Sequence, residues 1–80
     1  MHLLIISSTK TILDESNIES VSLPGSQGNF QVLKNHFNIV SQLVPGTITY
    51  VYEGQTEKKQ LGIENGIVTV HYNNIVVVLD

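Results

Sequence analysis

The sequence predicts an all-β domain, built as a sandwich or a barrel, and two observations support this prediction. First, Ile, Val and Thr supply 25 of the 80 residues, and Ala is absent. β-branched residues lose χ1 freedom in a helix and pack well on a pleated sheet. Second, apolar runs alternate with turn signals about every eight to twelve residues, and no long stretch keeps helical spacing. We expect one domain that spans residues 1–80.

The N-terminal part of the chain predicts two strands. Residues 2–7 are apolar on both faces, so the first strand should lie inside a sheet. Residues 11–13 and 18–23 should together form a second, long strand. Its apolar phase slips by one residue after Ile18, and a slip of one turns the following side chains to the opposite face. We therefore expect a β-bulge near Glu19–Ser20.

The middle of the chain predicts short strands with polar breaks between them. Residues 24–28 should form a loop, because Pro sets φ at a turn corner and each Gly permits a positive φ. Residues 30–32 should form a short strand, and Phe37 and Ile39 should alternate across the next one. We expect residues 40–43 to bend or turn once.

The C-terminal half predicts a hairpin. Residues 47–52 alternate as a strand, and residues 57–63 should form another. The Asn65-Gly66 pair is typical of a type I′ turn, which needs a positive φ at both central residues. We therefore expect residues 67–72 to pair with residues 57–63.

The last expected strand covers residues 75–79, after a turn at Asn73-Asn74. This strand is apolar on both faces. An exposed edge of that kind would aggregate, so we expect its edges to be covered.

Composition limits the classes of partner. The net charge is −3, with four Lys and no Arg, which argues against nucleic acid as the main ligand because phosphate contacts need a basic patch. The absence of Cys excludes disulfides and suits a reducing compartment. The apolar runs 3–6 and 75–79 are too short to span a bilayer, and no basic region precedes Leu3 as in a signal peptide. We expect no direct membrane insertion, and we expect a protein partner to stabilise so small a domain.

No pattern of catalytic or metal-binding residues stands out. His2, His36 and His71 lack the spacing of a metal motif, and no Gly-x-Ser-x-Gly elbow occurs. Residues 25–28 (Gly-Ser-Gln-Gly) lack the Lys-Ser or Lys-Thr pair that ends a phosphate-binding loop. The acidic residues are scattered near loops or on polar faces. We therefore expect a protein that is not an enzyme and has no cofactor or metal.

Several stretches, in order along the chain, carry a resemblance to one family. Residues 21–30 read Val-Ser-Leu-Pro-Gly-Ser-Gln-Gly-Asn-Phe, and residues 43–48 read Leu-Val-Pro-Gly-Thr-Ile. Residues 66–70 and 75–80 resemble the final hairpin of that family, and His2-Leu3 fits the beginning of its sequence. Together they resemble the epsilon subunit of F-type ATP synthases. The chain departs from the family pattern around His36, which lacks the neighbouring prolines and glycine, and at Asn29, where an acidic residue is common.

The resemblance implies a fold and a mechanical function. The fold would be a flattened β-sandwich of two antiparallel sheets with about ten short strands. The protein would be a non-catalytic part of the rotor, binding the gamma subunit and the c-ring and coupling proton translocation to ATP synthesis. It would lie at the cytoplasmic face of the bacterial inner membrane, as a peripheral part of the complex. Family members usually continue into two C-terminal helices, which carry the inhibitory action and, in some bacteria, ATP binding, so the resemblance of residues 1–80 implies neither property.

The resemblance also implies two sets of site residues. The loop expected to face the c-ring comprises Ser26, Gln27, Gly28, Asn29 and Phe30. In that set, Gln27 and Asn29 would form hydrogen bonds, while Phe30 would be either an apolar anchor or an ordinary core residue. The positions expected near gamma are Ser7, His36 and Ser41, and His36 has the alternative role of capping a turn.

Two other classes of function are compatible with an all-β fold. One is a small ligand-binding or adhesion-type β-sandwich module, which would need a concave aromatic patch around Tyr50, Tyr52 and Tyr72. Without such a patch, these tyrosines are core or cross-strand residues. The other class is an OB-like nucleic-acid binder, which the acidic net charge disfavours.

Overall fold

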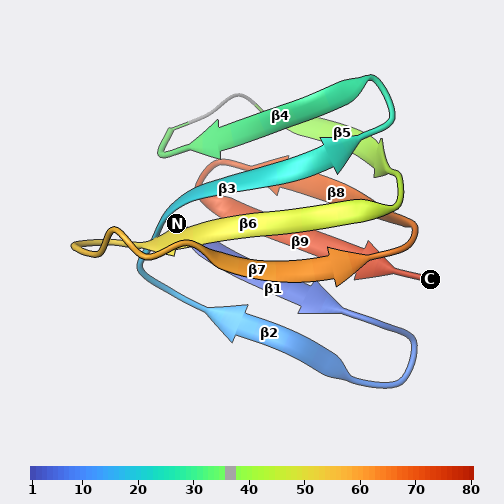
Figure 1. Ribbon diagram of the computed structural model, residues 1–80, viewed down its shortest axis with the longest axis horizontal. Helices are drawn as coiled ribbons and strands as arrows, with labels where there is room; N and C mark the ends of the chain where they lie inside the picture. Colours follow the sequence, from blue (N-terminus) through green and yellow to red (C-terminus); the bar gives the residue numbers. More distant parts are fainter. Residues whose placement is uncertain (36–37) are drawn as a thin grey trace.

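The computed structural model describes residues 1–35 and 38–80, and these residues form strands and turns without a helix. Figure 1 shows the nine strands of this described part. In chain order they are β1 (His2–Ile6), β2 (Thr11–Glu15), β3 (Ile18–Gly25), β4 (Gly28–Leu33), β5 (Ile39–Leu43), β6 (Gly46–Tyr52), β7 (Lys59–Ile63), β8 (Gly66–His71) and β9 (Asn74–Leu79). The all-β prediction is confirmed.

The strands form one curled sheet that folds over itself into two layers. The hydrogen-bonded order is β2-β1-β9-β8-β5-β3-β6-β7, with β4 paired to the free side of β3. In Figure 1, β4, β3, β6 and β7 form the near layer, and β5, β8, β9, β1 and β2 lie behind it. The layers join where β5 meets β3 at a single paired position, Gly25 with Leu43. This arrangement is the expected sandwich.

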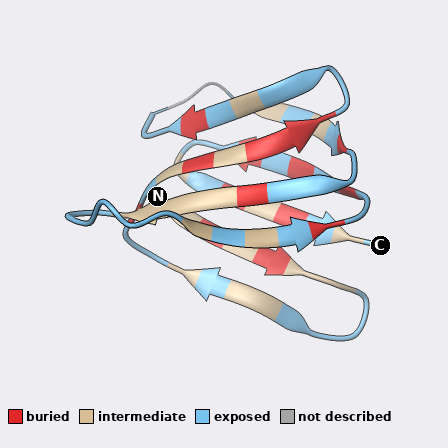
Figure 2. Cartoon of the chain, viewed as in Figure 1, coloured by how far each residue is buried: buried red, intermediate tan, exposed pale blue. Residues whose placement is uncertain are grey.

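The core fills the space between the two layers. Strand β8 shows the pattern clearly, since its residues alternate strictly between buried and exposed positions, as half-buried strands do. Figure 2 shows buried segments on strands of both layers. The fully buried apolar side chains are Leu3, Ile5, Ile18, Val21, Leu23, Val32, Ile48, Val68, Val70, Ile75 and Val77.

One strand pair departs from the expected antiparallel arrangement. β1 and β9 run parallel, with His2 opposite Asn74 and Ile6 opposite Val78, whereas the other paired strands of the described residues are antiparallel. Parallel neighbours need a long connection, and here the rest of the chain supplies it. The pairing covers both edges of β9, because β8 lies on its other side. The expectation that residues 75–79 are covered is therefore confirmed.

The expected long second strand is wrong. Residues 11–15 and 18–25 form two strands in different layers, and the chain turns between them at Asn17, whose φ is 60°. Asn tolerates this left-handed conformation better than most residues, so the turn has a local cause. The expected β-bulge is confirmed, since the register between β3 and β6 shifts between Ile18 and Ser20.

The expected Asn65-Gly66 hairpin is also wrong. Among the described strands, β7 pairs with β6, while β8 pairs with β5 and β9. Neither Asn65 nor Gly66 has a positive φ, so this is not a type I′ turn. The link instead carries the chain from the near layer to the far layer. Gly66 serves a different purpose there, because a Cβ on it would lie only 2.7 Å from the carbonyl oxygen of Val78.

Three smaller expectations need correction. β3 continues through Gly25 and β4 begins at Gly28, so the expected loop at residues 24–28 is a two-residue turn. Residues 40–43 are extended within β5 and do not bend. The last turn lies at residues 72–73, one position earlier than expected, with Tyr72 at a φ of 55°. The expected role of Phe37 in a strand concerns a position outside the described residues.

Candidate functional site

The β3–β4 hairpin brings together the residues expected to face the c-ring. Its ladder pairs Pro24 with Asn29 and Gly25 with Gly28, so only Ser26 and Gln27 form the turn. Gly28 has a φ of +116°, a conformation that side chains rarely adopt, which explains a glycine at this position. Residues 26–29 are all exposed. The hairpin therefore presents a polar tip of four neighbouring residues to its surroundings.

Close contacts hold this hairpin against the corner between β5 and β6. The amide of Ser26 donates to the carbonyl of Gln42 at 3.0 Å, and the amide of Val44 donates to the carbonyl of Pro24 at 2.9 Å. Gly46 packs so tightly on the Pro24 ring that a Cβ there would lie 2.8 Å from it. The tip is thus tied to two other strands and not only to its own hairpin.

Phe30 packs against the domain itself. Its side chain is half-buried and contacts the core, and it lies opposite Leu23 in the ladder. The ring covers Gly25, where a Cβ would lie 2.8 Å from the ring edge. These contacts anchor the hairpin to the sandwich. Part of the ring remains exposed at the surface.

The residues expected near gamma do not form one cluster. Ser7 lies between β1 and β2, where its amide donates to the carbonyl of Lys10 at 2.9 Å and its hydroxyl lies 3.4 Å from the same carbonyl. Ser41 lies in β5, and its hydroxyl donates to the carbonyl of Gln42 at 3.1 Å. Ser41 is therefore next to a residue that holds the hairpin, whereas Ser7 belongs to a separate turn. His36 lies outside the described residues.

A polar cluster that the sequence did not predict lies where β1 begins and β2 ends. His2 Nε2 lies 2.6 Å from Asp14 Oδ1, and Ser16 Oγ lies 3.3 Å from His2 Nδ1. The antiparallel pairing of β1 with β2 brings these distant positions together. The side chains of His2 and Asp14 are 40% and 58% exposed, so water screens them and no low-dielectric site activates the serine. The cluster is best explained as a link between two strands. Only the strand register could have revealed it.

The three tyrosines do not form one aromatic patch. The rings of Tyr50 and Tyr52 meet edge to face at 5.9 Å, and both side chains pack on the core. Partial burial raises the pKa of Tyr52 above its ordinary value of 10.0, and the nearby carboxylate of Glu15 raises it further. Tyr72 lies in the β8–β9 turn, where its ring contacts His71 at 4.5 Å. The platform needed for a sugar- or base-binding module is therefore not assembled from these residues.

Two further properties bear on the kind of site. In residues 1–35 and 38–80, no group of three or more His, Cys, Asp or Glu side chains is arranged to hold a metal ion. Nor does this part of the chain contain a helix that is long and apolar enough to cross a membrane.

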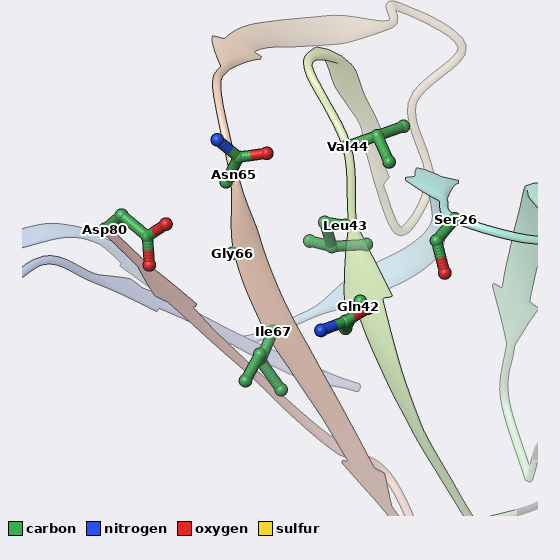
Figure 3. A pocket seen from close by; sticks show the side chains of 8 residues that line it. All are labelled: Ser26, Gln42, Leu43, Val44, Asn65, Gly66, Ile67 and Asp80. Carbon is green, nitrogen blue, oxygen red and sulfur yellow. The ribbon is translucent and has the colours of Figure 1, made fainter.

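A pocket opens beside the hairpin, where β5 ends and β8 begins. Its volume is about 320 Å³, and Figure 3 shows the side chains that line it. Four are polar and come from separate parts of the chain: Ser26, Gln42, Asn65 and Asp80. The expected c-ring loop therefore shares one residue, Ser26, with a pocket that no sequence pattern predicted.

Comparison with known proteins identifies the family. The family model for the β-sandwich domain of the ATP synthase delta/epsilon chain matches residues 1–80. The chain belongs to this family. The predicted resemblance to the epsilon subunit is confirmed.

Two sequence relatives of this delta/epsilon family member are named ATP synthase epsilon chain. It is 32% identical over 76 residues to the ATP synthase epsilon chain of Protochlamydia amoebophila, covering 95% of this chain and 50% of the relative. It is 32% identical over 80 residues to that of Symbiobacterium thermophilum, covering 100% of this chain and 56% of the relative. The chain thus spans about half the length of the curated relatives that it matches.

Solved structures place the same fold in ATP synthases. A chain of the Euglena gracilis mitochondrial ATP synthase, solved with OSCP, F1 and the c-ring, matches with a TM-score of 0.88 and 26% identity. The match covers 96% of this chain and 48% of that one. A chain from the central stalk and c-ring of the Tetrahymena thermophila enzyme matches with a TM-score of 0.80 at 12% identity, covering 98% of this chain and 61% of that one, which supports the fold alone.

Proposed function

We propose that this chain is a non-catalytic rotor component of an F-type ATP synthase, which links the gamma subunit to the c-ring and couples proton translocation to ATP synthesis. The observation that carries the proposal is the match of the delta/epsilon family model to all 80 residues. The likeness to a chain of an ATP synthase that includes F1 and the c-ring supports the same assembly. As a peripheral part of that complex, the chain would work at the cytoplasmic face of the bacterial inner membrane.

The packing of the molecule suits a mechanical function. A coupling element must transmit torque without changing shape, and closely packed sandwich cores have low compressibility. The two layers enclose eleven fully buried side chains, and no buried polar side chain interrupts the described part of the core. The hairpin that would meet the ring is tied through main-chain hydrogen bonds to β5 and to Val44, which lies between β5 and β6. A force on the hairpin tip would therefore act on the whole sandwich.

The exposed tip supplies the proposed contacts with the c-ring. Gln27 and Asn29 are exposed and can donate and accept hydrogen bonds with polar loops. Phe30 would contribute only the part of its ring that the core leaves uncovered. On the gamma side we propose Ser7, His36 and Ser41. The Ser41 hydroxyl uses its proton on the Gln42 carbonyl and keeps its acceptor lone pairs for a donor from gamma.

A double substitution at the tip tests this proposal. Gln27→Trp with Asn29→Trp should leave the isolated domain folded, because both side chains are exposed. In membrane vesicles whose ATP synthase contains this chain, the bulky rings should separate the tip from the ring loops. Binding of the chain to the c-ring should then weaken by about tenfold, the effect of losing roughly 1.4 kcal/mol of contact energy, and proton-driven ATP synthesis should fall with it.

A matched pair at the other end of the molecule provides the control. Gln55→Trp with Thr56→Trp adds the same rings to an exposed loop between β6 and β7, and ATP synthesis should be unchanged. Equal synthesis by both double variants would contradict the assignment of the tip. Size-exclusion chromatography with purified gamma tests the other contact, because a rotor component should elute with gamma as one complex. Separate elution at micromolar concentrations would contradict the proposed function as a whole.

A further inference from the structure

The pocket beside the hairpin has the chemistry of a cation site. Its floor is the paired end of β5 and β8, where Leu43 and Gly66 lie opposite each other and are buried. Around this floor stand the carboxylate of Asp80, the side-chain amides of Gln42 and Asn65, and the hydroxyl of Ser26. Figure 3 shows the Asp80 carboxylate and the Asn65 amide oxygen on the side of the pocket where Gly66 lies. Together these groups offer several oxygen acceptors from different strands.

The polar groups of the pocket are free to bind a ligand. Within residues 1–35 and 38–80, the side chains of Ser26, Gln42, Asn65 and Asp80 form no hydrogen bond with another group of the chain. Asp80 is the only charged residue that lines the described pocket, and no lining residue is basic. A phosphate or carboxylate would therefore meet a carboxylate without a counter-charge, whereas a cation would be attracted.

The apolar part of the pocket suits a long side chain. Val44 and Ile67 line it and are 38% and 48% exposed, so their aliphatic surface is open to contact. Long basic side chains place their methylene stems along such surfaces while the charged head reaches polar groups. The volume of about 320 Å³ lies at the lower limit of small-molecule sites, which fits one side chain better than a nucleotide.

We propose that this pocket receives an arginine side chain from a partner protein that docks against the β3–β4 hairpin. Arginine fits better than lysine because its planar guanidinium presents five N–H donors, and the acceptors are spread over four residues. The location of the partner at the hairpin rests on the proposed function. The preference for a cation rests on the pocket alone, so the two parts can fail separately.

The preference is tested by nuclear magnetic resonance on the ¹⁵N-labelled 80-residue chain. The probe is N-acetylarginine methylamide, and the matched control is its citrulline analogue, which has nearly the same shape without the charge. The arginine probe should shift the amide signals of Ser26, Asn65 and Ile67 with a dissociation constant on the order of millimolar. The citrulline probe should bind at least about threefold more weakly. Equal shifts with both probes, or no shifts at the pocket, would overturn the proposal.

Two substitutions separate the pocket from general surface charge. Asp80→Asn should weaken arginine binding at least about threefold, since it removes the charge of the side chain but keeps its shape. The fold should persist, because Asp80 is exposed and its hydrogen bond to the Asn65 carbonyl comes from its main-chain amide. Glu64→Gln removes a neighbouring carboxylate that does not line the pocket, and should leave binding unchanged. If both variants weakened arginine binding equally, the probe would be attracted by the general surface charge and not by the pocket, and the proposed site would be wrong.

The outcome also distinguishes this proposal from the proposed function. If the chain elutes with gamma and supports ATP synthesis but the arginine probe does not bind in the pocket, the pocket proposal fails and the rotor function stands. If the probe binds as expected but the chain does not elute with gamma, the rotor function fails, and the cation preference stands without its partner.

Discussion

The two ends of the sandwich are held together by different means. At the hairpin end, which carries the turns after β1, β3, β5 and β7, three glycines lie where main chains and rings approach closely. A Cβ on Gly25, Gly46 or Gly66 would lie within 2.8 Å of a neighbouring heavy atom. At the opposite end, asparagine side chains join the connections. Asn73 Oδ1 accepts from the amide of Asn35, and Asn38 Oδ1 accepts from the amide of Tyr72, both at 2.9 Å.

This difference indicates how the molecule divides its tasks. Close packing leaves no room to rearrange, so the hairpin end keeps its shape when a partner presses on it. An exposed side-chain hydrogen bond contributes less to stability than close packing does, because the same groups can bond to water instead. The proposed interface residues 26–29 and the pocket both lie at the closely packed end. Three predictions measure the contrast in stability.

The largest effect is expected from filling the space above a glycine at the hairpin end. Gly25→Ala would place a Cβ 2.8 Å from both the Gly28 carbonyl oxygen and the Phe30 ring. Overpacking of this kind should lower the free energy of unfolding by about 1–3 kcal/mol, measured by urea denaturation. Gly62→Ala in β7 is the control, since nothing lies within 4 Å of its Cβ position, and it should change stability by less than about 0.5 kcal/mol. If both variants lost a similar free energy of unfolding, close packing around Gly25 would not explain the effect.

A medium effect is expected at the opposite end. Asn73→Ala removes the acceptor for the Asn35 amide at 2.9 Å and the weaker bond to the Asn35 side chain at 3.4 Å. The free energy of unfolding should fall by about 1 kcal/mol, the usual net value of one hydrogen bond. Asn74→Ala, at the next exposed position, should have a smaller effect, because its side chain forms no hydrogen bond within the described residues. A loss at Asn73 that exceeds the loss at Gly25 would reverse the contrast between the two ends.

The smallest effect is expected for the link between β1 and β2. Asp14→Asn removes the charge from a contact of 2.6 Å with His2, in which both side chains are exposed to water. This contact is an ion pair only when His2 is protonated, and exposed ion pairs contribute about 0.2–1 kcal/mol, so the change in unfolding free energy should stay below about 1 kcal/mol. Urea denaturation in low and high salt checks this, since the difference should shrink with added salt. A large loss that is independent of salt would mean that the cluster holds β2 by packing or by hydrogen bonds alone.

Much of the fold could be predicted from local patterns. The abundance of β-branched residues and the spacing of turns predicted an all-β domain, and the phase slip at Ile18 predicted the bulge. The apolar residues 75–79 predicted a strand with covered edges, because such a strand cannot be left exposed. These features depend on the residue types within one short segment, so the sequence of that segment is enough to predict them.

Strand pairing could not be predicted in the same way. The Asn65-Gly66 pair has the composition of a tight hairpin, yet it joins two layers, because Gly66 is needed for contact with Val78 and not for its φ. The pairing of β1 with β9 joins the two ends of the chain, and no local signal specifies it. The His2–Asp14 contact and the pocket follow from pairings of this kind.

The amino-acid sequence alone determined that this protein is built from short strands, which segments must be buried, and which family it resembles. The tertiary structure decided which strands lie side by side. It therefore also decided that Ser26 and Asp80, which are far apart in the sequence, line the same pocket. The reason is physical: the preference of a residue for a strand depends on its own side chain and its neighbours in the chain. The choice of partner strand depends on how two whole layers bury their apolar faces together.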